Sequence, residues 1–183
     1  MNRLMGQSGF PKRFLTAHLK DFQTKYDVPE SDQGFYITGK RGVGKTHLLA
    51  AICKHKIAAH LKANANDIEN KDLPAFISVP ELLFQFKQSY SKNSNTSEDE
   101  ILNKYTHVRV LALDDLGAER STDWAIQLLC LLVNRRYSDM RQTFISSNLP
   151  LDQIASQLDD RIASRIAGMC DVVEIQGQDR RIR

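Results

Sequence analysis

Hydrophobic residues along this chain fall into two alternating patterns, short apolar runs and longer stripes at helical spacing. The runs predict strands at residues 34–38, 75–79, 108–115, 143–148 and 171–175. The stripes predict helices at residues 46–61, 81–90, 98–105, 122–137, 151–158 and 159–167, and we expect Gly168 to end the last of them. Since strands alternate with helices throughout, the pattern predicts an α/β fold with a mainly parallel sheet.

The length and the polar segments indicate one domain. The 183 residues suit a single core, and we expect residues 1–34 to lead into a core formed by residues 35–183. Residues 62–72 and 91–97 are rich in polar residues and are predicted to be loops. The run at 108–113 is almost continuously apolar, which is typical of a strand covered on both faces.

The composition narrows the class of protein. No apolar run is long enough to span a bilayer and the first ten residues show no signal-peptide pattern, so we expect a cytoplasmic protein without a membrane partner. The net charge of +3 is compatible with nucleic-acid binding without being evidence for it. The cysteines Cys53, Cys130 and Cys170 form no C-x-x-C pair, which favours buried free thiols over a zinc site.

A glycine-rich loop lies between the first strand and the first long helix. It fits G-x-x-x-x-G-K-[ST], the Walker A phosphate-binding loop, in the strand–loop–helix context that this motif requires. The glycines let backbone N–H groups point at phosphates, the helix N-terminus favours an anion, and Lys45 adds a positive charge. Thr46 offers a hydroxyl to Mg²⁺. The predicted nucleotide-binding residues here are Gly39, Lys40, Arg41, Gly42, Val43, Gly44, Lys45, Thr46 and the next residue, His47.

Polar residues also end two other predicted strands. Asp114 and Asp115 follow a mostly aliphatic run, the Walker B pattern. Asp114 is predicted to hold Mg²⁺ through its water shell, and Asp115 to orient or deprotonate an attacking water. The amide of Asn148 is placed to hold the γ-phosphate or that water, although it also suits a cap for the helix at Pro150. Because ligands of parallel sheets bind at the carboxyl ends of strands, we expect these motifs to meet.

Three further groups of residues keep two interpretations each. Arg161 and Arg165 lie four apart on one helix face, which suits either a solvated basic surface or phosphate contacts across a subunit interface. The aromatic residues of the segment at 10–22 either pack outside the sheet or wall a base. The basic tail that ends at Arg183 suits either solvent or DNA.

The chain closely resembles the AAA+ ATPases of the DnaC/DnaI helicase-loader group and the related transposition ATPase IstB, over about residues 9–181. The resemblance rests on the ordered runs GKRGVGKTHLLAAI, SVPELL, LALDDLGAE, ISSNL and LDDRIASRI. It implies a P-loop NTPase (AAA+) three-layer sandwich with a five-stranded parallel sheet and no C-terminal lid domain. It also implies ATP and Mg²⁺ as cofactors and self-assembly into rings or spirals on single-stranded DNA.

The resemblance assigns roles to individual residues. It makes the glycine loop Walker A, Asp114 and Asp115 Walker B, and Asn148 the sensor of the fourth strand. Arg165 matches the arginine finger that reaches a neighbour's γ-phosphate, with Arg161 as its companion. Arg181, in a terminal D-x-R, matches the second sensor, and the run GFPKRF resembles the segment that holds adenine. Helicase loaders also carry an N-terminal domain that grips the helicase, whereas this sequence has only eight residues ahead of Gly9.

We therefore expect a helicase-loader-like ATPase that acts in DNA replication, with a replicative helicase as a possible partner. One alternative is an IstB-like ATPase that assists a transposase. Another is a nucleotide-gated binding module with negligible turnover, because Asp115 stands where the family usually has the longer Glu.

Overall fold

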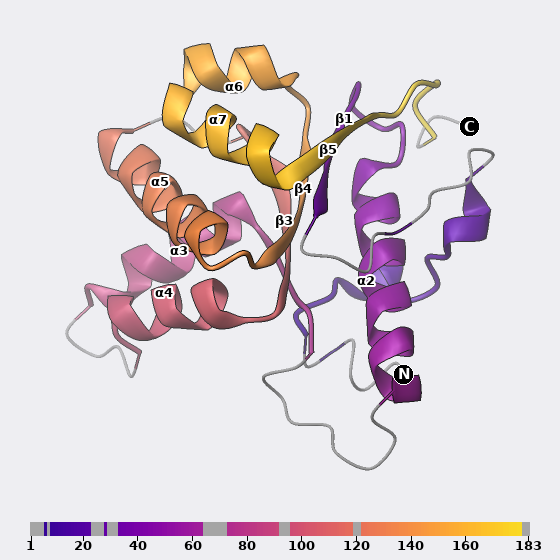
Figure 1. Cartoon of the computed structure of the whole chain (residues 1–183), viewed down its shortest axis with the longest axis horizontal. Helices are drawn as coiled ribbons and strands as arrows, with labels where there is room; N and C mark the ends of the chain where they lie inside the picture. The colour runs from indigo at the N-terminus through magenta and orange to yellow at the C-terminus, as the bar shows by residue number, and fades with distance from the viewer. Residues whose placement is uncertain are drawn as a thin grey trace.

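The computed structural model describes residue 6, residues 8–22, residue 28 and residues 33–63, 73–91, 96–118 and 122–180, without the side chains of residues 60, 61 and 63. Its centre is a five-stranded parallel sheet with strand order β2-β3-β4-β1-β5 (Figure 1). The strands are β1 (Gly34–Thr38), β2 (Ala75–Ser78), β3 (Val110–Leu116), β4 (Gln142–Ser147) and β5 (Cys170–Glu174). The predicted fold class and the five-stranded parallel sheet are confirmed.

Helices cover both faces of this sheet. Figure 1 shows α2 (Lys45–Ala63) and the N-terminal 3-10 turns η1 (Lys12–Phe14) and η2 (Leu19–Asp21) on one side. The other face carries α3 (Val79–Ser89), α4 (Glu98–His107), α5 (Asp123–Ser138), α6 (Leu151–Gln157) and α7 (Asp160–Met169). Among the residues described, no helix has the length and hydrophobicity that crossing a membrane requires.

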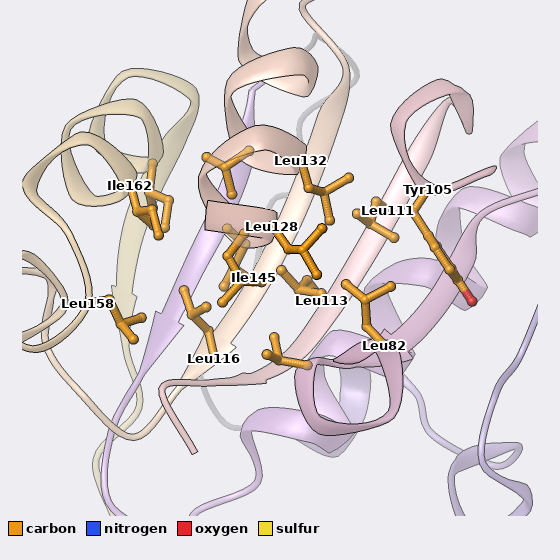
Figure 2. Close-up of a cluster of buried hydrophobic side chains, with 14 of the residues drawn as sticks. Leu82, Tyr105, Leu111, Leu113, Leu116, Leu128, Leu132, Ile145, Leu158 and Ile162 are labelled. Atoms are coloured by element: carbon orange, nitrogen blue, oxygen red, sulfur yellow. The ribbon is translucent and has the colours of Figure 1, made fainter. Parts of the chain in front are cut away.

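Two hydrophobic clusters form because consecutive strand residues point to opposite faces. In β1, Phe35 and Ile37 pack towards α2, whereas Tyr36 packs towards α3–α7. Figure 2 shows the cluster between the sheet and α3–α7, in which leucines of α3 and α5 meet Leu111 and Leu113 of β3. Each fully buried aliphatic side chain of this kind contributes about 1.5–3 kcal/mol to folding.

The start of α4 follows a local sequence rule, whereas the end of α7 does not. Ser97 and Glu100 form the capping box at the start of α4, as their spacing indicates. The expectation that Gly168 ends the last helix is wrong, because α7 continues through it to Met169. The glycine instead permits close packing, since a Cβ at Gly168 would lie 2.9 Å from the Tyr137 ring of α5.

The cysteines are all free thiols. Cys53 and Cys170 are buried, as expected, whereas Cys130 on α5 is only half-buried. Burial raises the pKa of the Cys53 and Cys170 thiols well above their usual range, so both stay protonated at neutral pH.

Candidate nucleotide-binding site

A pocket of 460 Å³ opens at the carboxyl ends of β1, β3 and β4, where the predicted motifs meet. The P-loop follows β1, Asp115 lies near the end of β3, and Asn148 directly follows β4, which pairs with β1. The described residues that line the pocket are Arg13, Phe14, Arg41, Gly42, Gly44, Lys45, Thr46, His47, Asp115, Ala118, Asn148 and Arg180. Three motifs far apart in the sequence therefore share one cavity.

The glycine loop has the backbone that its sequence indicates. Gly42 and Gly44 have φ values of 81° and 109°, which a residue with a Cβ rarely adopts. Nζ of Lys45 donates to the carbonyl oxygens of Gly39 and Lys40, both at 2.8 Å, and so lies in the cradle of the loop. Val43 is buried in the α2-side core, where it anchors the loop to the sheet.

Asp114 is a buried carboxylate, only 5% exposed, beside the P-loop helix. Its Oδ1 accepts hydrogen bonds from the hydroxyls of Thr46, at 3.1 Å, and of Ser146 on β4. Burial raises the pKa of Asp114 to about 6, the negative charge of Asp115 adds to the rise, and the two hydroxyls oppose it.

This arrangement fits Mg²⁺. Among the described residues, no lysine or arginine forms an ion pair with Asp114, so the cost of burying its charge has no basic side chain to offset it. Mg²⁺ prefers oxygen ligands and is commonly held by one or two carboxylates together with substrate phosphates and water. The Asp114 carboxylate and the Thr46 hydroxyl supply such oxygens next to the phosphate loop.

Asp115 departs from regular strand geometry. Its φ is 57°, and its N–H donates to the Ser146 hydroxyl at 3.1 Å. The pairing of β3 with β4 is irregular between Leu113 and Leu116, and β3 continues to Leu116 rather than ending at the two carboxylates. Sequence patterns at residues 146–148 did not identify Ser146, because a serine within a strand has no local feature that separates it from Ser147.

The N-terminal aromatics lie in two different places. Phe10 packs on Phe76 of the edge strand β2, with ring centroids 5.1 Å apart. Phe14 lines the pocket, and its ring meets His47 edge-on at 6.1 Å. Nε2 of His47 lies 2.7 Å from the Asp21 carboxylate, which joins the N-terminal segment to the P-loop helix and lowers the pKa of Asp21.

Arg180, which was not among the predicted site residues, also lines the pocket. Its guanidinium lies 5.1 Å from the Phe22 ring centroid, and its backbone N–H donates to the Gly42 carbonyl at 3.1 Å. Arg181, the predicted second sensor, lies outside the described residues.

Arg161 and Arg165 lie on α7, and neither is among the described residues that line the pocket. Nε of Arg165 donates to Oδ1 of Asn134 at 2.5 Å, and its Nη1 donates to the Arg161 carbonyl at 3.2 Å. Arg161 pairs with Asp159 at 2.8 Å, as the solvated interpretation expected, and this lowers the pKa of Asp159 to about 2.

Comparison with known proteins gives several similar chains. The replicative helicase loader DnaI of Bacillus subtilis (strain 168) is 31% identical over 181 residues, which cover 91% of this chain and 53% of DnaI. The replicative helicase loader DnaC of Escherichia coli (strain K12) is 28% identical over 132 residues, 72% of this chain and 49% of DnaC. The chain thus spans about half the length of these two relatives.

Solved structures agree in fold. A crystal structure of the DnaC helicase loader has a TM-score of 0.72 and 26% identity, with 91% of this chain and all of that chain covered. A crystal structure of DnaI has a TM-score of 0.69 and 29% identity, with 93% and 94% covered. The model of the IstB-like ATP-binding protein family matches residues 15–183. Since that match includes the P-loop and both strand-end motifs, the chain belongs to the family of IstB-like ATP-binding proteins.

Proposed function

We propose that this chain binds ATP with Mg²⁺ in the pocket and hydrolyses it as a helicase-loader-like AAA+ ATPase. The observation that carries the proposal is the meeting of the P-loop, Asp115 and Asn148 in one cavity, with Asp114 and Thr46 bonded to each other behind it. The loop and Lys45 bind the phosphates. Thr46 and Asp114 hold Mg²⁺, which supplies charge neutralisation at the β- and γ-phosphates.

Hydrolysis needs a water placed in line with the γ-phosphate. Asp115 orients or deprotonates that water, and Asn148 holds the γ-phosphate or the water from the other strand. The side chain of Asp115 is one methylene shorter than Glu, so its carboxylate reaches less far into the pocket. We therefore propose slow turnover, which rises when subunits assemble.

Arg165 acts on a neighbouring subunit's nucleotide in this proposal. Arg165 does not line the pocket of its own chain, which supports a role in trans, and the bond that it donates to Asn134 holds its guanidinium at the α5–α7 surface. Such an arginine stabilises negative charge that develops on the transferred phosphoryl group. Arg161 is its companion on the same helix.

The biological setting follows from the relatives. The similarity to DnaI and DnaC supports a role in DNA replication, with single-stranded DNA and a replicative helicase as partners and a ring or spiral as the assembly. The match to the IstB-like family favours a second candidate, in which the ATPase assists a transposase. Co-purification with each candidate partner in the presence of ATP separates the two settings.

The first test is ATP hydrolysis by the purified chain, with and without single-stranded DNA, over a range of protein concentrations. We expect turnover per subunit to rise with both, because assembly completes each site. The inactive control is Lys45→Ala, which removes the phosphate-binding ammonium. Tight ATP binding with flat, near-zero turnover under all conditions would instead identify a nucleotide-gated binding module.

A mixing experiment tests whether Arg165 acts in trans. Arg165→Ala keeps an intact ATP site, and Lys45→Ala keeps an intact finger, so each should be inactive by itself. Mixed in equal amounts, they should recover part of the turnover, because Lys45→Ala subunits supply the arginine to Arg165→Ala neighbours. If the mixture is no more active than its components, Arg165 does not act across the interface.

A further inference from the structure

The single hydroxyl of Ser146 joins the carboxylate of Asp114 to the backbone of Asp115. Ser146 lies on β4 and is completely buried. Its Oγ accepts the N–H of Asp115 at 3.1 Å and donates to Oδ1 of Asp114. The same Oδ1 accepts the Thr46 hydroxyl, so one carboxylate oxygen links β3, β4 and the P-loop helix.

The strand pairing explains why this bond is needed. Leu113 pairs with Ile145 and Leu116 pairs with Ser147, so Asp114 and Asp115 together stand opposite Ser146. This extra residue on β3 is a bulge, a feature that often re-aims a side chain next to a functional site. In the bulge, Asp115 adopts a φ of 57° and its N–H bonds to a side chain of β4.

The bulge decides which way Asp115 points. In a regular strand, Asp114 and Asp115 would face opposite sides of the sheet, because the side-chain period is two. Here Leu113 and Leu116, three residues apart, both lie in the cluster under α3–α7, as Figure 2 shows. Asp115 is thereby left on the P-loop side, where it lines the pocket near Lys45 and Thr46.

We propose that Ser146 is a positioning residue for the Walker B pair: its hydroxyl holds the bulge that turns Asp115 into the pocket and fixes Asp114 beside Thr46. This inference rests on the proposed function, since it takes ATP and Mg²⁺ as the ligands of the site. Ser146 itself touches neither ligand in this mechanism and acts through the two carboxylates.

The chain offers a matched control on the next residue. Ser147 is also completely buried, and its Oγ donates to the Leu116 carbonyl at 2.7 Å and accepts the Leu149 N–H at 3.0 Å. It therefore has the same type of side chain and the same burial, but these two bonds go to backbone groups, and the side chain beside it is the Tyr36 hydroxyl rather than a carboxylate. Any effect of Ser146→Ala that Ser147→Ala lacks is specific to the carboxylates.

The experiment measures ATP affinity with and without Mg²⁺ by titration calorimetry, together with turnover and thermal unfolding. For Ser146→Ala we expect the Mg²⁺-dependent gain in ATP affinity and the turnover each to fall by about 10-fold or more, the range typical of losing a residue that holds a metal ligand in place. ATP affinity without Mg²⁺ should stay within about 2-fold, because the phosphate loop is unchanged. Ser147→Ala should keep both the gain and the turnover.

Two further variants distinguish a specific effect of the hydroxyl from a general loss of folding. Ser146→Cys keeps the volume but is a poor hydrogen-bonding group, so it should reproduce the loss. Ser146→Thr keeps the hydroxyl and should restore much of the Mg²⁺ effect. Two results would overturn this inference while leaving the proposed function intact. One is a Ser146→Cys protein with the Mg²⁺ dependence of the unaltered chain. The other is an equal loss in Ser146→Ala and Ser147→Ala. No Mg²⁺-dependent ATP binding by the unaltered chain overturns the proposed function and this inference together.

Discussion

Arg136 on α5 provides a quantitative test of how the sheet is held together. The residue is 1% exposed, and burial lowers the pKa of its guanidinium to about 9, so the side chain remains a cation at neutral pH. Nη1 donates to the carbonyl oxygens of Tyr105, Thr106 and Val108 at 2.8, 3.0 and 2.9 Å. Nη2 donates to the Gln142 carbonyl at 2.7 Å, and Nε donates to the Thr143 hydroxyl at 2.9 Å. One side chain therefore ties the end of α4 to the beginnings of β3 and β4.

The expected loss of stability on replacing Arg136 can be worked out from these contacts. Arg136→Met fills most of the space but leaves four carbonyl oxygens without this donor, at about 1–3 kcal/mol each when they are buried. Because the variant has no buried charge, it also lacks the desolvation penalty of several kcal/mol that the guanidinium carries, and this partly offsets the loss. We expect a net loss of about 3–5 kcal/mol in the free energy of unfolding, comparable to removing one partner of a buried charge pair. For a chain of this size that corresponds to a fall in Tm of about 6–20 °C.

Urea denaturation followed by circular dichroism measures this loss, with Arg141→Met as the matched control. Arg141 donates to the His107 carbonyl at 3.0 Å in an exposed position, so its loss should change stability by less than about 1 kcal/mol. Arg136→Lys, with three donors in place of five, should be intermediate. If the free energy of unfolding of Arg136→Met lies within about 1 kcal/mol of that of the unaltered protein, water or repacking satisfies the carbonyls and the predicted loss is wrong.

Three other predictions concern the surface and the pocket rim. Arg180→Ala should weaken ATP binding by about 3–10-fold through loss of the pocket wall and the stack on Phe22, and unchanged affinity in a titration would exclude that role. The folded-state pKa of Asp159 is lowered from 3.8 to about 2, chiefly by its hydrogen bond with Arg161, so the stability that it contributes is present above pH 3.8 and is lost as the pH falls towards 2. Asp159→Asn should flatten that part of the acid denaturation curve, and an identical curve would contradict the assignment. Finally, affinity for single-stranded DNA should fall steeply and log-linearly with salt concentration, whereas a salt-independent affinity would argue against phosphate contacts.

Local sequence determined the chemistry and most of the secondary structure. The spacing of glycines, Lys45 and Thr46 is a local property, and so is the apolar run that carries Asp114 to the end of a strand. The rule that parallel strands present their carboxyl ends to one edge was enough to bring Asn148 to the same pocket. The single-residue prediction for Gly168 failed because a contact with Tyr137, on another helix, outweighed the local preference of glycine for a helix end.

Only the tertiary structure decided which contacts each of several chemically similar residues makes. Ser146 and Ser147 are identical in sequence terms, and a bulge on a strand some thirty positions earlier assigns one to the carboxylates and the other to backbone groups. Arg136 follows Arg135 at the end of a helix, and its sequence context predicts a solvated cation. Its partners at the end of α4 and just before β3 instead place it in the core. These assignments depend on contacts between segments that are distant in the chain, so no window of the sequence contains them. The residues fix which groups are available, and the packing of α5 and β4 against β3 selects among them.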